Sequence, residues 1–350
     1  MVGRIDLSRV RELPQLDVKD KRILSLLATD ARQPLTQVAK QVRLSRDAVE
    51  YRIRRMQEQE IILGFVPQLD FGRLGFYTFH VFLLIDDMAQ KQQDALIAFL
   101  AAHKNVRSVI EYSDRWDLEV VLLARSLQDF DDLVLDIAQR YPDIILEKDK
   151  VEIIKQYGHT AFPRLLPDEK RVRSSERPPV DKIELDATDL RILAELGKDC
   201  RASTYVIGSA VGMSADAVAY RIKRLVSSGV IRRFTIAADL TLLGLQWYTY
   251  TIETKMFTPE NEATLEEFLD MDPSVIRSAK TLGGWDLLLY VVAASPHDFH
   301  VTVRALKGLF PSIVKNYQAW IAYKEHAHTP VPACLLGETH NKPAAKKRKT

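Results

Sequence analysis

The sequence predicts an α+β protein built from two copies of one unit, each with a helical domain followed by a sheet domain. It repeats itself without a gap at an offset of 169 (185 − 16), so that Leu16-Asp17 meets Leu185-Asp186 and Trp116-Asp117 meets Trp285-Asp286. Within each copy the spacing of apolar residues changes from a helical period to a period of two. A chain of 350 residues has room for about two to four domains.

The start of copy one predicts three short helices with a tight break between the last two. Asp17 is a good N-cap, and Ile23 and Leu27 lie on the apolar stripe of a first helix. Pro34 can open a second helix, and Ser45 can cap a third. Three helices in this arrangement are typical of a helix-turn-helix domain.

The rest of copy one is rich in β-branched and aromatic residues, as strands require. The expected strands are 61–69, 76–85, 106–113, 116–124 and 144–154, with helices near 90–102 and 127–140. After the first short strand this order is β-α-β-β-α-β, which is the split βαβ or ferredoxin-like arrangement. Its helices cover one face of the sheet, and the apolar residues on both faces of strand 76–85 require a second sheet on the other.

The repeat and the composition together divide the chain into six parts. The expected parts are a helix-turn-helix domain at 1–60, a ferredoxin-like effector domain at 61–157, a proline-rich linker at 158–184, the second helix-turn-helix domain at 185–229, the second effector domain at 230–326 and a basic, disordered tail at 327–350. A linker of this length can span a domain, so one chain is expected to replace a dimer, with its two sheets facing each other.

Composition excludes several classes of function. The net charge is only +2, so any binding of nucleic acid must use local basic patches. Cys200 and Cys334 occupy unrelated places and suggest neither a disulfide nor a metal cage, and no stretch of about 18 apolar residues predicts a membrane span. We therefore expect a cytoplasmic protein with no cofactor, no metal, no membrane partner and no catalytic residues. His80 is expected to be packed, and the pair His326 and His328 is a weak metal site at best.

The third helix of each copy has the composition of a DNA-recognition helix. Val49, Ile53 and Met56 form an apolar face that can dock on the domain, and the opposite face is polar. An isolated segment of this kind could be an ordinary solvated helix, but two copies preceded by correctly spaced helices favour DNA. The candidate DNA-binding residues are Ser45, Arg46, Asp47, Glu50, Tyr51, Arg52, Arg54 and Arg55 in copy one, and Ser214, Asp216, Ala219, Tyr220, Arg221, Lys223 and Arg224 in copy two.

Taken together, these motifs resemble the leucine-responsive/asparagine-synthase regulators, the Lrp/AsnC family. The shared patterns are Leu-Asp-x-x-Asp-x-x-Ile-Leu, then Ser-x-Asp-Ala-Val-x-Tyr-Arg-Ile-x-Arg, then Trp-Asp between two strands, within 16–157 and 185–326. The resemblance implies a winged helix-turn-helix domain joined to a ferredoxin-like effector domain, with effector domains that pair through their sheets. It further implies double-stranded DNA as a partner, possible homo-oligomers, and a small effector, commonly an amino acid, bound near the turn before Trp-Asp.

Two positions depart from the family pattern in copy one. Where copy two has Gly212 at the helix-turn-helix break, copy one has Arg43, which would cost about 1 kcal/mol in a left-handed conformation. Where copy two has Gly283-Gly284 before Trp-Asp, copy one has the charged pair Asp114-Arg115. The resemblance therefore places a surviving effector site in copy two, although Gly283-Gly284 could equally serve only as a hairpin turn. The implied effector-binding residues are Thr281, Gly283, Gly284, Trp285 and Asp286.

Two other functions compete with a DNA-binding transcriptional regulator. Sirohaem decarboxylases are similar to this family and pair two such modules, but they would need histidines and arginines around the effector cavity. The sheet turns here carry Trp116 and Trp285. A third possibility is an effector-binding module whose helix-turn-helix domains are vestigial. The outward residues of the two recognition helices differ, so the two DNA half-sites are expected to differ as well.

Overall fold

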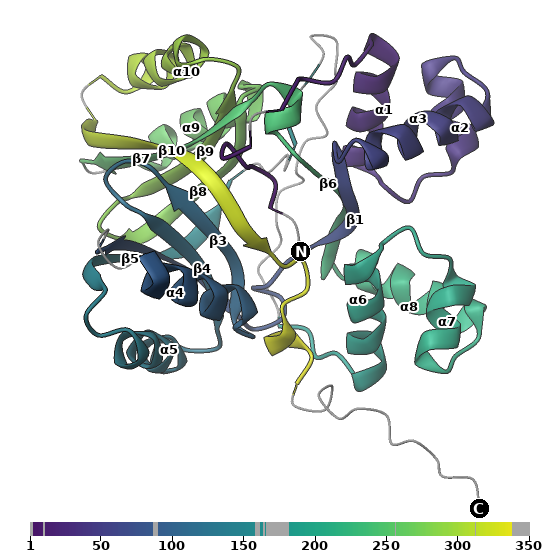
Figure 1. The fold of residues 1–350 in the computed structure, drawn as a ribbon, viewed down its shortest axis with the longest axis horizontal. Helices are drawn as coiled ribbons and strands as arrows, with labels where there is room; N and C mark the ends of the chain where they lie inside the picture. Colours follow the sequence, from purple (N-terminus) through teal and green to yellow (C-terminus); the bar gives the residue numbers. More distant parts are fainter. Residues whose placement is uncertain are drawn as a thin grey trace, which may run out of the picture.

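A computed structural model describes residues 3–9, 11–86, 90–157, 162–163, 165, 182–255, 257–311 and 313–337. The chain forms two parts joined by a narrow two-stranded ribbon (Figure 1). One part is a closed barrel with helices outside it, and the other holds the two helix-turn-helix domains. No helix among the described residues is long and apolar enough to cross a bilayer.

Both helix-turn-helix domains form as the sequence predicts. Copy one has α1 (Val18–Thr29), α2 (Leu35–Val42) and α3 (Arg46–Glu58), and copy two has α6 (Ala187–Lys198), α7 (Thr204–Val211) and α8 (Ala215–Ser227). Asp17 and Asp20 form a capping box at the start of α1. Both breaks are left-handed, with φ of 55° at Arg43 and 74° at Gly212, so Arg43 adopts a conformation that favours glycine.

The short strands that follow the helices form a sheet of their own. They are β1 (Ile62–Leu69) and β6 (Ile231–Ala238), one from each copy, and they pair antiparallel. The sequence interpretation placed them in the two effector domains. The structure corrects this, because their apolar residues complete one core with both helix-turn-helix domains. This β1–β6 ribbon therefore fixes the two domains to each other within one chain.

The remaining strands form one closed barrel. Copy one contributes β2 (Tyr77–Ile85), α4 (Gln90–Ala102), β3 (Val106–Tyr112), β4 (Leu118–Ala124), α5 (Leu127–Arg140) and β5 (Ile145–Gln156). Copy two contributes β7 (Gln246–Thr254), α9 (Pro259–Met271), β8 (Val275–Gly283), β9 (Leu287–Ala293), α10 (Pro296–Leu309) and β10 (Val314–His328), with 3-10 turns η1 (Thr241–Leu243) and η2 (Ala333–Leu335) outside the barrel. The strand order around the barrel is β10-β3-β4-β2-β5-β8-β9-β7.

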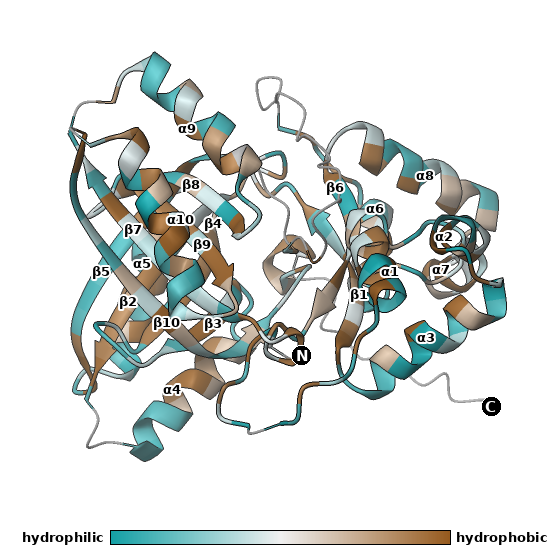
Figure 2. Ribbon diagram, turned by 90° about the horizontal axis from the view of Figure 1, so that it is seen from above, coloured by the Kyte–Doolittle hydropathy of each residue, from teal (hydrophilic) through white to brown (hydrophobic). Residues whose placement is uncertain are grey.

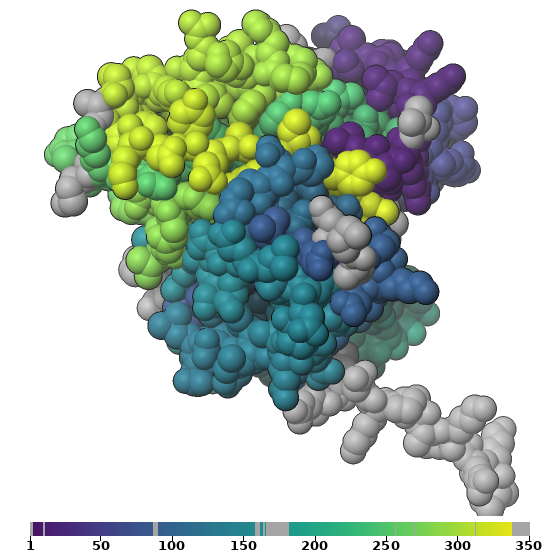
Figure 3. Space-filling model, turned by 60° about the vertical axis from the view of Figure 1, so that its left-hand side comes forward, coloured from purple at the N-terminus to yellow at the C-terminus, as the bar shows by residue number. Residues whose placement is uncertain are grey.

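The two copies pair within the chain, but they join at their edges rather than only face to face. β5 pairs with β8 and β10 pairs with β3, both antiparallel, and these two seams close the barrel. The space-filling view shows the copy-one half (blue to teal) beside the copy-two half (green to yellow) (Figure 3). Edge pairing satisfies backbone groups that two separate sheets would leave exposed.

Aromatic side chains fill the inside of the barrel. Phe82 lies 5.1 Å from Trp285 and 5.7 Å from Trp320, measured between ring centroids, and all three are buried. The four helices of the barrel half lie outside it, where two further apolar clusters attach them to the strands (Figure 2). The barrel is therefore a packed core rather than a channel.

Both ends of the described chain differ from the expected boundaries. Ile5 is fully buried in the barrel core and Asp6 forms a β-bridge with Lys324, so the start of the chain belongs to the barrel and not to the first helix-turn-helix domain. At the other end, Val331 and Leu335 are buried in the core that contains the helix-turn-helix domains. The expected disordered tail is thus ordered to residue 337, because these apolar residues have a surface to pack on. The rest of that tail, and most of the expected linker, lie outside the described residues.

Candidate nucleic-acid interface

The recognition helices α3 and α8 present their polar faces to solvent. Each helix has one aromatic residue, a tyrosine, and it is exposed: 63% of Tyr51 and 68% of Tyr220 is accessible. Arg54 and Lys223 are also exposed on the same helices. An exposed tyrosine beside an exposed cation can contact both base edges and phosphates. The orientation of each helix follows from its buried face, which in α3 consists of Val49, Ile53 and Met56 and in α8 of Val218, Ile222 and Leu225.

The N-terminus of each recognition helix is capped by serine. The Ser45 hydroxyl accepts a hydrogen bond from the Ala48 amide at 3.1 Å, and the Ser214 hydroxyl accepts one from the Ala217 amide at 3.3 Å. These predicted DNA-binding serines therefore have a structural role in the free protein. Both remain exposed at the start of the helix, where a phosphate would meet free amide groups.

Four arginines that were predicted to flank the DNA surface form ion pairs with buried aspartates. In copy one, Arg52 lies 2.8 Å from both Asp17 and Asp20, and Arg55 lies 2.7 Å from Asp20. Only 1% of the Asp20 side chain is exposed, so that carboxylate requires the two guanidinium groups. Hydrogen bonds to Asp17 and Asp20 raise the pKa of Arg52. We call this group the aspartate clamp of α1.

Copy two repeats the clamp. Arg221 lies 2.6 Å from Asp186 and 2.8 Å from Asp189, and Arg224 also pairs with Asp189. The Asp189 side chain is fully buried. The clamp explains why both copies carry Leu-Asp-x-x-Asp at the first helix and Tyr-Arg-Ile-x-Arg at the third, since each pattern supplies one side of the contact. The sequence indicates Asp17 only as a helix cap and gives no sign of the contact between the two helices.

The two recognition surfaces are not equivalent. In α3, Arg46 pairs with Glu50 across one helical turn at 3.7 Å. The corresponding residues of α8 are Ala215 and Ala219, which have no charge. Asp47 and Asp216 occupy the same place in the first turn of each helix and are exposed. The two helices therefore share a tyrosine but differ in this charged pair and in the exposed cation, Arg54 in α3 and Lys223 in α8.

In the glycine turn of copy two, each predicted effector residue has structural contacts that account for its presence. Thr281 donates to the Trp285 carbonyl at 2.5 Å, and the Asp286 carboxylate accepts from the Thr254 amide at 2.6 Å. Gly283 has φ of 147°, and a Cβ there would lie 2.4 Å from the Lys150 carbonyl oxygen. Gly283 is thus required by the close approach of β5 to β8. Trp285 belongs to the barrel core, and the atoms nearest to a Cβ on Gly284 would be those of the Asp149 carboxylate.

The corresponding turn of copy one is tied to its own sheet. Arg115 pairs with Glu147 at 2.6 Å and stacks 4.5 Å from the Trp116 ring centroid. Asp117 accepts a hydrogen bond from the Ile85 amide at 2.6 Å, as Asp286 does from Thr254. The aspartate of each Trp-Asp pair therefore holds the end of a neighbouring strand.

His80 is packed inside the barrel, as expected, but in a polar cluster. Its Nδ1 lies 2.5 Å from Glu119 Oε1, and Tyr112 and Tyr290 donate their hydroxyls to the same buried carboxylate. Burial is the main cause, and the negative charge of Glu119 the second, that raises the pKa of both tyrosines well above the ordinary value of a tyrosine. Glu119 is fully buried, and these donors satisfy it.

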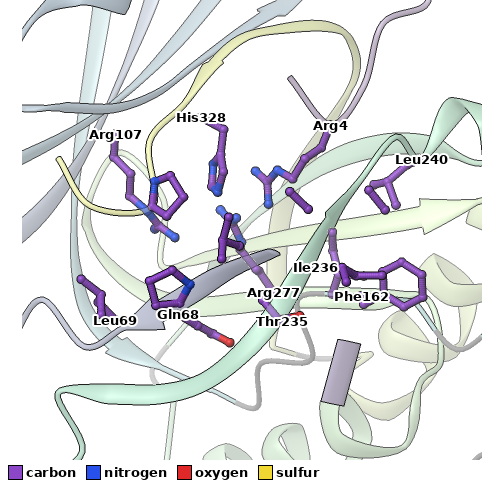
Figure 4. A pocket seen from close by; sticks show the side chains of 16 residues that line it. Arg4, Gln68, Leu69, Arg107, Phe162, Thr235, Ile236, Leu240, Arg277 and His328 are labelled. Carbon is purple, nitrogen blue, oxygen red and sulfur yellow. The ribbon is translucent and has the colours of Figure 1, made fainter. Parts of the chain in front are cut away.

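A cavity between the barrel and the β1–β6 ribbon contains residues that were not predicted. Arg4, Arg107, Arg277 and His328 come from four distant segments and point their polar ends toward it (Figure 4). A comparison of the two copies could have pointed to these arginines, because neither has an arginine as its counterpart at the offset of 169. Arg277 corresponds to Ser108 of copy one, and Arg107 corresponds to Ile276 of copy two. His326 lies 2.6 Å from Glu111 instead of forming a pair with His328, and no group of three or more metal-binding side chains occurs in the described parts of the chain.

Two helix-turn-helix domains with exposed recognition helices, held together by a shared ribbon and core, define a DNA-binding transcriptional regulator. The AsnC-type helix-turn-helix domain matches residues 16–57 and 185–226. The chain belongs to the Lrp/AsnC family of regulators. It is 37% identical over 127 residues to the HTH-type transcriptional regulator Rv2324 of Mycobacterium tuberculosis, a match of 36% of this chain and 82% of that one. It is 30% identical over 140 residues to the HTH-type transcriptional regulator LrpA of Pyrococcus horikoshii, 38% of this chain and 98% of that one.

Each of these two relatives corresponds to little more than one copy of the repeat. Among solved structures, the sirohaem decarboxylase NirDL in complex with an iron-uroporphyrin III analogue is similar over 90% of this chain and 94% of its own, with a TM-score of 0.59 and 12% identity. At that identity the likeness concerns the fold alone.

Proposed function

We propose that this chain is a single-chain, sequence-specific regulator whose two helix-turn-helix domains contact two half-sites of double-stranded DNA. The observation that carries the proposal is the β1–β6 ribbon, which joins both domains into one core and leaves both recognition helices exposed. A protein that reads two neighbouring major grooves needs two recognition helices in a fixed arrangement. Each half of the barrel then corresponds to a ferredoxin-like effector domain, and chains can associate further into homo-oligomers.

The contact surface that we propose is smaller than the one expected from sequence. Its centre is Tyr51 and Arg54 in α3, with Tyr220 and Lys223 in α8, which are all exposed. Ser45, Arg46, Asp47 and Glu50 surround it in copy one, and Ser214, Asp216 and Ala219 do so in copy two. Arg52, Arg55, Arg221 and Arg224 act indirectly, because their guanidinium groups are held by the aspartate clamps.

Alanine substitution of Arg54 is expected to weaken binding by about 1–3 kcal/mol if its guanidinium reads a base. The optimal site, selected from random DNA, is expected to contain two different half-sites, since Arg46 and Glu50 have no counterpart in α8. Binding is measured by fluorescence anisotropy at several salt concentrations, and a smaller salt slope in Arg54→Ala indicates a lost phosphate contact.

The matched control is Arg115→Ala, which removes an exposed arginine on the barrel and is expected to leave DNA affinity unchanged. A selected site that is a perfect palindrome contradicts the prediction that the two half-sites differ. Absence of salt-dependent binding to any selected DNA contradicts the proposal as a whole and favours an effector module with vestigial DNA-binding domains.

We further propose that an amino acid modulates binding at the Gly283-Gly284 turn. The turn is exposed, with 64% of Leu282 accessible, and Gly283 and Gly284 are exposed as well. Backbone amides in such a turn can bind a carboxylate. Because the turn is exposed, a bound effector would need to be covered by a second chain. Copy one instead places Asp114 there, which would repel a carboxylate.

A thermal-shift screen of the common amino acids is expected to find one that raises the melting temperature. Gly284→Asp is expected to abolish this rise, because the new carboxylate repels that of the effector, and Asp114→Gly is expected to preserve it. Gly284 is chosen over Gly283 because the atoms nearest to a Cβ there belong to the Asp149 side chain, which can move, and not to the backbone. No response to any amino acid, or a response lost in Asp114→Gly alone, contradicts this site.

A second candidate function is an enzyme similar to sirohaem decarboxylases. One observation favours it: three arginines and a histidine line a cavity, although the sheet turns carry tryptophan. The volume of that cavity, about 40 Å³, is too small for a tetrapyrrole without rearrangement. An absorption band from added iron-uroporphyrin that shifts on binding to the purified chain would support the enzyme.

A further inference from the structure

The cavity between the barrel and the ribbon is lined by two structural units that belong to different parts of the molecule. β1 and β6 line one side with residues 66–69 and 235–238. The barrel lines the other side with Arg107 of β3, Arg277 of β8 and His328 at the end of β10. The N-terminal segment adds Arg4 (Figure 4). Anything bound there would contact both the barrel and the ribbon that carries the helix-turn-helix domains.

Among the residues that the structure describes, Arg4 is the only one of the three cavity arginines with a carboxylate partner. Arg4 binds Glu325 through two side-chain hydrogen bonds of 2.9 and 2.7 Å, and Ser108 donates to the same carboxylate at 2.7 Å. Within the described residues, Arg107 and Arg277 form no ion pair, and the buried Nε of each has no hydrogen-bond partner. Both guanidinium groups lie against ring faces: Arg107 is 5.0 Å from the Phe71 centroid, and Arg277 is 5.6 Å from that of Tyr290 and 5.9 Å from that of Trp247.

The remaining groups at the cavity do not supply the missing negative charge. Burial, followed by the charge of Arg4, lowers the pKa of His328 to about 3, so the ring is neutral near pH 7. Its Nδ1 has no hydrogen bond and lies 3.5 Å from Glu325. Burial also lowers the pKa of Arg277 to about 10, which still leaves it charged. Arg232 is held by Asp70 at 2.7 Å, so that carboxylate is already paired.

The fold itself does not require these arginines. Strand β3 has Ser108 at the position where β8 has Arg277, and β8 has Ile276 at the position where β3 has Arg107. The equivalent strand of the other copy therefore forms with an uncharged residue at each of the two arginine positions. An enclosed charge without a partner costs stability, so two such arginines at one cavity indicate a ligand rather than a packing need.

We propose that this cavity binds a small oxyanion, a carboxylate or a phosphate group, between Arg107 and Arg277. Guanidinium groups recognise both anions through paired N–H donors. The volume of about 40 Å³ holds about three water molecules, which matches the head group of such an anion and not a large cofactor. His328 adds a neutral hydrogen-bonding nitrogen at the edge of the site.

The test uses the full chain without DNA, so its outcome does not depend on the proposed function. Thermal unfolding is followed in sodium acetate, in sodium phosphate and in sodium chloride at equal ionic strength. At least one oxyanion is expected to raise the melting temperature in a saturable manner relative to chloride. Saturation by acetate alone indicates a carboxylate ligand, and saturation by phosphate alone indicates a phosphate ligand.

Two variants take the residue that the other copy already carries at the same position, Arg277→Ser and Arg107→Ile. Both are expected to lose the oxyanion response and, in chloride, to melt at the same temperature as the natural chain or higher, since an unpartnered charge is removed. Arg115→Gln, on the barrel surface, is the control and is expected to keep the response. The proposal is overturned if neither oxyanion exceeds chloride, or if both cavity variants keep the full response. If one variant does not fold, the other decides.

Discussion

Replacement of Asp189 by alanine is expected to destabilise the second helix-turn-helix domain by about 1–3 kcal/mol. The Asp189 side chain is fully buried and receives the guanidinium groups of Arg221 and Arg224. Its removal leaves Arg224 without its carboxylate partner and Arg221 with Asp186 alone, and it also breaks the contact between α6 and α8. DNA binding by this domain is therefore expected to be lost, although Asp189 itself cannot reach DNA.

Chemical denaturation followed by circular dichroism measures this effect, with Lys198→Ala as the control in the same helix. Lys198 forms only an exposed pair with Glu195, so its removal is expected to change the unfolding free energy by less than about 1 kcal/mol. Asp20→Ala is expected to act on the first domain as Asp189→Ala does on the second, because the clamp is repeated. A destabilisation below about 1 kcal/mol in both aspartate variants would show that the clamps are not needed for folding.

Substitution of Gly283 by alanine is expected to cost about 2–4 kcal/mol by opening a seam of the barrel. A Cβ there would lie 2.4 Å from the Lys150 carbonyl oxygen, and φ of 147° is a conformation that alanine rarely adopts. The obstacle is backbone and cannot rotate away. The pairing of β5 with β8 must therefore shift, and with it one of the two places where the copies join.

Gly64→Ala is the matched control, because an added Cβ at that position in β1 meets no atom within 4 Å. That variant is expected to be neutral or slightly stabilising. Hydrogen exchange separates the two effects: Gly283→Ala is expected to expose amides of β5 and β8 first, with the helix-turn-helix domains unchanged. Equal stability of the two glycine variants would mean that the seam accepts a side chain at Gly283.

Much of the proposed DNA-binding surface follows from the sequence, because the exposed face of a helix depends on local periodicity. Val49, Ile53 and Met56 at helical spacing define the buried face of α3, so the opposite face is known without the structure. The roles of Arg52 and Arg55 were not predictable in this way. They lie at the edge of that face, and only the packing of α1 beside α3 shows that Asp20 receives them.

The cavity was beyond prediction for a different reason. Arg4, Arg107, Arg277 and His328 are far apart in the chain, and each taken alone resembles an ordinary polar residue at the end or edge of a strand. Comparison of the copies shows that Arg107 and Arg277 are unmatched, but not that they line one cavity.

The sequence by itself determined the repeat, the order of helices and strands in each copy and the family, because these follow from residue identity and from periods of two and 3.6. The tertiary structure alone decided how the copies join. Whether two sheets stack or pair at their edges depends on backbone hydrogen bonds between strands more than a hundred residues apart, such as those of β5 with β8 and of β3 with β10. Side-chain periodicity does not report on those bonds. The same closure brings the N-terminal segment and the end of β10 to one cavity.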